Sequence, residues 1–224
     1  MVLGRGRRAS GRRASFPPRA SGATIGPMTV SSEVPRAAGR VLSALAEHGL
    51  LLEQDRELPN VVTLVTGDHP KTSWWSHPKG RLVFAVLAHL ADHEDVLVTK
   101  LLRGKRTFVH RRLWPALLAV ARERVEWQLD GLSAAARRLL AESERSGLET
   151  SGAAVKELEE RLLVHVEEVH TDSGKHALRV ESWTAWAQRR RVRAERSPDR
   201  ARRTLSQAAA ALGARRALPW PSEE

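Results

Sequence analysis

Apolar residues recur at helical spacing through much of the first half of the chain. The spacing predicts a helix over residues 37–52, a second over 79–91 and a third over 112–127. Pro78 and Pro115 fall in first turns, where proline is tolerated. In the second helix the apolar face consists of Leu82, Val83, Val86, Leu87 and Leu90. This pattern is typical of helices that bury one side in a shared core.

Short β-branched runs separate these helices. Residues 61–65 predict a strand. Residues 96–102 and 107–110 flank an Arg-Gly-Lys turn at 103–105, which predicts a β-hairpin. The first half therefore has the order helix, helix, two-stranded wing, helix, which is that of a winged-helix module.

The same order recurs in the second half, in shortened form. It comprises helices over 132–146 and 153–162, a hairpin over 163–180 that turns at 172–175, and a helix from Ser182. We therefore predict a mainly α protein with small β-hairpins, of the α+β class. Two tandem winged-helix modules, at 36–130 and 131–190, precede a C-terminal helix and tail at 191–224.

The basic charge of the chain lies at its two ends. The formal net charge is +11. Residues 1–27 hold six arginines and no acid, residues 187–224 hold ten arginines and four acids, and the rest is nearly neutral. We expect residues 1–35 to be a disordered basic tail; in a second interpretation the protein starts at Met28. The C-terminal helix, capped by Ser197, offers little to bury at 208–212.

Three segments carry a resemblance to known proteins. They are SWWSHPKG at 73–80, LVTKLLRGKRTFVHRRLWPALLAV at 97–120 and ELEERLLVHVEEVHTDSGKHALRVESWTAWA at 157–187. These segments resemble uncharacterised bacterial winged-helix proteins related to the alkylpurine and interstrand-crosslink DNA glycosylases. The resemblance implies DNA binding linked to repair. A glycosylase-like activity is a weaker implication, because the only match to the family's Gln-x-Asp catalytic element is Gln128–Asp130, at a helix end.

The first module has the charge that a DNA contact needs. The segment from Lys100 to Arg112 holds six bases and no acid, and basic side chains on a hairpin suit a phosphate backbone. The predicted contacts to duplex DNA are Lys79, Arg81, Lys100, Arg103, Lys105, Arg106, Arg111 and Arg112. The other interpretation is a soluble surface hairpin. In the second module the helix over 153–162 is acidic, and we expect it to be a solvated face of a structural module.

The tryptophan pair in the loop before the second helix has two interpretations. Trp74 and Trp75 precede His77 in a segment broken by prolines. Such a pair most often packs on the core. Alternatively, Trp74, Trp75 and His77 form a stacking site for an unpaired base.

Several other functions lack the residues that they need. The chain has no cysteine, which excludes disulfides and thiolate metal sites and fits a cytoplasmic protein. His89 and His93 are four residues apart, but without the Glu of an HExxH motif, so we predict no metal and no cofactor. No apolar run reaches the roughly 18 residues of a membrane span. We therefore predict a non-enzymatic DNA-binding protein; a protein–protein interaction module and a glycosylase-like enzyme are the alternatives.

Overall fold

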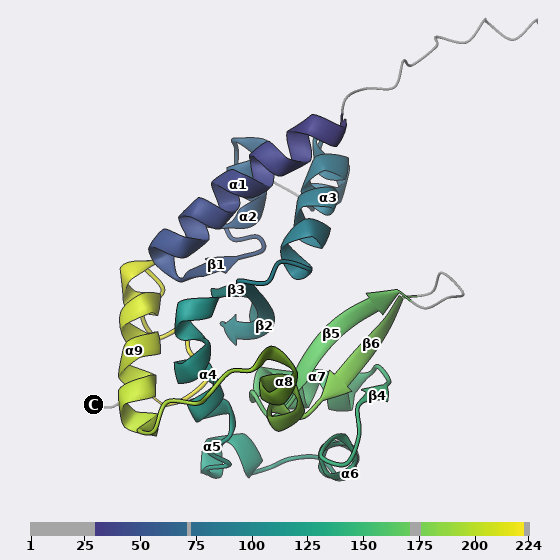
Figure 1. Cartoon of the computed structure of the whole chain (residues 1–224), viewed down its shortest axis with the longest axis vertical. Helices are drawn as coiled ribbons and strands as arrows, with labels where there is room; N and C mark the ends of the chain where they lie inside the picture. The colour runs from purple at the N-terminus through teal and green to yellow at the C-terminus, as the bar shows by residue number, and fades with distance from the viewer. Residues whose placement is uncertain (1–29, 71–72, 171–175, 222–224) are drawn as a thin grey trace, which may run out of the picture.

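The computed structural model describes residues 30–70, 73–170 and 176–221 (Figure 1). The turn predicted at 172–175 and residues 1–29 of the predicted tail lie outside the described residues, whereas residues 30–35, also predicted as disordered tail, form the start of a helix. The first module has the elements α1 (Val30–His48), β1 (Leu50–Leu52), α2 (Val61–Thr66), α3 (Gly80–Ala91), β2 (Val96–Leu102) and β3 (Lys105–His110). Its antiparallel sheet has the order β1-β3-β2, with Val98 opposite Phe108. The predicted order of two helices and a hairpin is present here, with helix α2 and strand β1 in addition.

Two local predictions in this module are wrong. Residues 61–65 form helix α2 instead of a strand: the Asn60 side chain accepts a hydrogen bond from the Thr63 amide at 2.9 Å, and Gly67 ends the helix at φ 88°. This capping outweighs the strand preference of the valines. Residues 50–52 form β1 instead of the end of α1, because Gly49, at φ 82°, ends the helix.

The second module repeats the sheet with one helix fewer. After α4 (Trp114–Ala121) and α5 (Glu126–Leu129) come α6 (Ala134–Ser143), β4 (Leu148–Glu149), α7 (Ala153–Glu160), β5 (His165–His170) and β6 (His176–Glu181). The strand order is β4-β6-β5. Helix α8 (Trp183–Arg190) follows, and the predicted helix over 112–127 is divided into α4 and α5. The α+β class, mainly helical with small antiparallel sheets, is confirmed.

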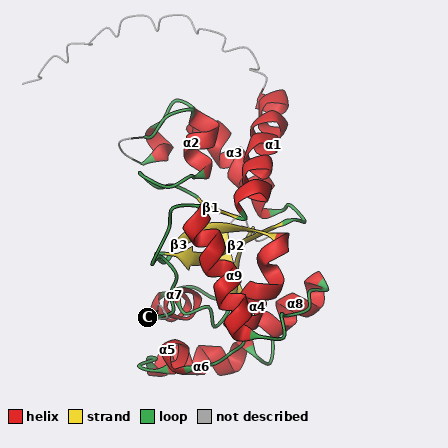
Figure 2. Ribbon diagram, turned by 90° about the vertical axis from the view of Figure 1, so that its left-hand side faces the viewer, coloured by secondary structure: helices red, strands yellow, loops and turns green. Residues whose placement is uncertain are grey.

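The C-terminal helix α9 (Pro198–Ala211) belongs to the core of the first module. It lies along α4 in both views (Figures 1 and 2). Its inner face, Leu205 and Ala209, is buried, and so are Leu212 and Trp220 beyond it. The expectation that 208–212 offers little to bury is therefore wrong: small alanines allow α9 to approach α4 closely. A separate, smaller core fills the second module.

Candidate nucleic-acid interface

The first wing is the β2–β3 hairpin, and its tip is anchored to the loop that follows β1. Lys105 Nζ lies 2.8 Å from Asp55 Oδ2, and Arg103 lies 3.9 Å from the same carboxylate. The Asp55 side chain is only 2% exposed and also accepts hydrogen bonds from the Glu57 and Leu58 amides. Burial raises the pKa of Asp55, but the bonds from Lys105 and the two amides outweigh it and lower the pKa to about 2. Asp55 is therefore a charged anchor for the wing.

The rest of the wing is held in the same way. Arg106 pairs with Glu53 at 3.3 Å, and Lys100 pairs with Glu159 of α7 at 2.8 Å. The Arg103 amide donates to the carbonyl of Ala217 in the C-terminal segment at 2.6 Å. The first wing therefore lies against the loop after β1, the second module and the C-terminal segment at once.

Of the four remaining predicted cations, three have a partner in the structure. Arg111 pairs with Asp95 at 2.9 Å, Arg112 donates to the Glu47 carbonyl at 2.8 Å, and Lys79 donates to the Thr66 carbonyl at 2.8 Å. Arg81 is exposed and has no partner among the described residues. Of the eight predicted contacts, only Arg81 is thus left uncommitted within the described part of the chain.

Helix α7 is a contact surface inside the molecule and not the solvated face that we expected. Glu159 binds Lys100 of the first wing. Glu157 accepts hydrogen bonds from the amide and hydroxyl of Ser133, which lower its pKa. The Arg161 side chain, just after α7, donates to the backbone carbonyls of Trp127 and Asp130. The acidic charge of α7 thus complements the basic charge of the wing.

The two tryptophans of the pair differ in their burial. Trp74 is buried, and its indole N–H donates to Glu53 Oε1 at 3.2 Å. Trp75 stacks on it, with ring centroids 4.1 Å apart, but is itself 65% exposed. His77 lies 3.3 Å from Asp68 and turns toward that carboxylate. The core interpretation thus applies to Trp74, and Trp75 remains available for stacking.

Helix α3 continues this exposed aromatic surface. Phe84 is 45% exposed, and its ring centroid lies 5.7 Å from that of Trp75. Arg81, Phe84 and Ala88 follow one another at helical spacing on the outer side of α3, which contains no acid. We call Trp75, Arg81, Phe84 and Ala88 the α3 face. Sequence reasoning missed Phe84, although the signal was present: it is the one large apolar residue of α3 outside the apolar stripe.

The close approach of α3 to the Trp pair depends on Gly80. A Cβ at this position would lie 3.0 Å from the Trp74 carbonyl and 3.1 Å from that of Trp75. The Gly80 amide also donates to the His77 carbonyl at 2.7 Å. The absence of a side chain at Gly80 therefore sets Trp75 beside Phe84.

The residues considered for enzymatic or metal chemistry are buried or do not gather into a metal site within the described residues. Gln128 is fully buried; its amide donates to the Ala121 and Arg161 carbonyls, and its oxygen accepts from the Val125 amide. It joins the two modules and is closed to substrate. His89 and His93 have ring centroids 6.3 Å apart, and the described residues contain no group of three metal ligands.

A buried ionic cluster in the second wing was not foreseen. Glu181 accepts from both His165 and Arg189, and Arg189 also binds Glu167 at 3.2 Å. Burial raises the pKa of Glu181, but the hydrogen bonds from His165 and Arg189 outweigh it and lower the pKa to about 2. The cluster ties α8 to the second sheet.

Comparisons with known proteins add no assignment. No protein family, curated protein or solved structure matches the chain. In the described ranges, no helix has both the length and the apolar character needed to cross a membrane. The function is therefore argued from the surface alone.

Proposed function

We propose that this protein is a non-enzymatic DNA-binding protein whose α3 face contacts duplex DNA. The proposal keeps the binding function expected from the sequence and changes the surface that carries it. The first wing supplies structure, because its cations are neutralised by Asp55, Glu53 and Glu159.

The observation that carries the proposal is the exposed outer side of α3, the helix that precedes the β2–β3 hairpin. In helix-turn-helix proteins the second helix of the motif enters the major groove and reads base edges with its N-terminal residues. We infer the same role for α3, which precedes the hairpin and whose first turn presents Arg81 without a competing carboxylate among the described residues. Arginine is the residue that most often pairs with guanine in this groove.

The apolar members of the α3 face fit the same surface. Ala88 has a short side chain that permits close approach, and Phe84 can contact thymine methyl groups. Trp75, at the start of the face, offers a flat ring to a sugar or an exposed base. Each phosphate contact steepens the plot of log affinity against log salt concentration by about 0.9. Because Arg81 is the one cation of the α3 face, we expect this face to contribute little to the salt dependence of binding.

The test is a titration of labelled duplex DNA with the full chain and single variants. Arg81→Ala and Phe84→Ala should each weaken binding by about 5- to 100-fold, the equivalent of about 1–3 kcal/mol. Arg138→Ala is the matched control, because Arg138 is an exposed arginine of α6 without a partner in the described part of the chain. Using the full chain keeps the arginines of residues 1–27 in every sample. Equal affinities for all three variants and the wild type would exclude the α3 face.

The exposed aromatic pair favours one alternative, a protein–protein interaction module. Trp75 and Phe84 are the large hydrophobic side chains that the described residues expose, and tryptophan is enriched at interface hot spots. This alternative predicts that DNA affinity is unchanged in Trp75→Ala, whereas capture of a protein partner is lost.

A further inference from the structure

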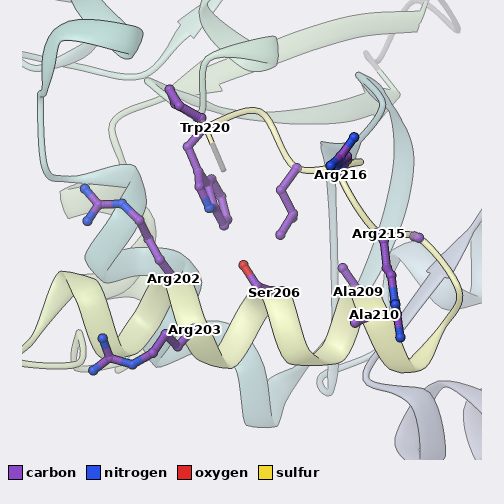
Figure 3. Close-up of a pocket in the computed structure, with 11 residues that line it drawn as sticks. Arg202, Arg203, Ser206, Ala209, Ala210, Arg215, Arg216 and Trp220 are labelled. Atoms are coloured by element: carbon purple, nitrogen blue, oxygen red, sulfur yellow. The ribbon is translucent and has the colours of Figure 1, made fainter. Parts of the chain in front are cut away.

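The end of α9 and the segment that follows it enclose a cavity of about 310 Å³ (Figure 3). Its wall contains four arginines, Arg202, Arg203, Arg215 and Arg216, and no acid among the described residues that line it. No residue of the α3 face lines this cavity, so it is a second site, independent of the proposed DNA contact.

Three of these arginines have no ion-pair partner among the described residues. Arg202 binds Glu123 and Asp199. Arg203, Arg215 and Arg216 are exposed and have no ion-pair partner within the ranges that the structure describes. Figure 3 places Arg203 at one end of the cavity and the other two at the opposite end. The described residues that line the cavity supply no carboxylate to these three arginines, so a bound anion would gain from their positive charge.

The space between the arginines can hold the aromatic ring of a ligand. The Trp220 indole and the Ser206 hydroxyl point toward one another across it (Figure 3). Trp220 is buried and lies 6.2 Å from Trp127, centroid to centroid, so its ring is held in place. Ala209 and Ala210 line the cavity with small side chains and leave room beside the indole.

The local backbone supports a built site. Gly213, at φ 89°, ends α9, and the Ala214 amide donates to the Ala209 carbonyl at 2.8 Å, which turns the chain back over the helix. Arg216 has φ 59°, a left-handed conformation uncommon for a residue with a side chain. Arg103 of the first wing holds the Ala217 carbonyl at 2.6 Å. The segment that carries Arg215 and Arg216 is thus fixed at both ends.

We propose that this cavity binds the phosphate monoester of a nucleotide. Arginine forms bidentate hydrogen bonds to phosphate oxygens, and the lining offers donors from opposite ends. Small-ligand sites commonly join an apolar wall to a few convergent polar groups, in volumes from about 300 Å³ upward. The base lies against Trp220 and the phosphate meets the arginines. The phosphate is carried by a free mononucleotide or by the 5′ end of a DNA strand.

Calorimetric titration of the full chain with AMP, adenosine and inorganic phosphate tests the site. We expect AMP to bind and adenosine to bind at least about tenfold more weakly, because adenosine lacks the charged group. Arg203→Gln and Arg215→Gln should each weaken AMP binding by about tenfold. Arg138→Gln, a matched exposed arginine, should leave it within about twofold. Equal affinity for AMP and adenosine, or equal AMP affinity in the four proteins, would overturn the proposal.

Two further measurements separate loss of this site from misfolding and from loss of the α3 face. Inorganic phosphate should displace AMP from the unaltered protein, whereas chloride at matched ionic strength should not; displacement by both to the same extent contradicts a phosphate site. Competition between AMP and a short strand with or without a 5′ phosphate shows which source binds more tightly. Arg81→Ala should leave AMP binding unchanged, so that loss of the DNA function and loss of this site are distinguishable.

Discussion

At the scale of single residues, the decisive group is the buried carboxylate of Asp55. It joins the loop after β1 to the wing through Lys105 and holds two backbone amides. Asp55 is named in no sequence prediction, because an acid between Gln54 and Arg56 in a polar stretch has no pattern of its own. Its partner Lys105 is fifty positions away, and only the fold brings the two together.

Asp55→Asn should lower the free energy of unfolding by about 2 kcal/mol at pH 7, because it removes the charge and keeps the amide contacts. The pKa of Asp55 is lowered to about 2 from 3.8. The contribution of the charge is therefore complete above about pH 4 and is lost as the pH falls toward 2. Urea unfolding of both proteins across this range measures it. Glu57 is an exposed carboxylate that, like Asp55, lies 3.9 Å from Arg103. Glu57→Gln should therefore change stability by less than about 0.5 kcal/mol. An equal effect of both substitutions would contradict the role of Asp55 as the anchor of the wing.

At the scale of elements, the main revision concerns α9. Its arginines and alanines resemble a polar tail in sequence, because its buried stripe consists of small alanines and a single leucine and is weakly hydrophobic. In the structure Ala201, Leu205 and Ala209 form a narrow inner stripe against α4. Helix α3, with its clear apolar periodicity, and helix α6, with its Ser133 cap, were predictable, whereas α2 was not, since its length of six residues is too short to show a period.

Leu205→Ala should destabilise the protein by about 2–5 kcal/mol, the usual cost of truncating a buried leucine. Gln207→Ala, on the exposed side of the same helix, is the control and should change stability by less than about 0.5 kcal/mol. Thermal unfolding followed by circular dichroism compares them. If Leu205→Ala left the melting temperature unchanged, α9 would be a tail after all.

At the scale of the whole molecule, opposite charges join the two modules. The basic wing meets acidic α7 through Lys100 and Glu159, in a body that is nearly neutral by composition. A count of bases along 100–112 could locate the wing, but it could not show that carboxylates from two other segments, the loop after β1 and α7, lie within ion-pair distance. For the candidate site, Trp75 and Arg81 were predicted from the sequence, whereas Phe84 was missed although it is the one large apolar residue of α3 outside the apolar stripe.

The central claim is that α3, and not the first wing, contacts DNA. The most direct test is a nuclear magnetic resonance map of the unaltered protein with and without duplex DNA. The chain has seven tryptophans, and Trp75→Phe assigns the Trp75 indole signal among them. We predict that the Trp75 indole and the amides of Arg81, Phe84 and Ala88 shift on addition of DNA, while the amides of Arg103, Lys105 and Arg106 do not. Shifts confined to the wing amides, with Trp75 and α3 unchanged, would contradict the account.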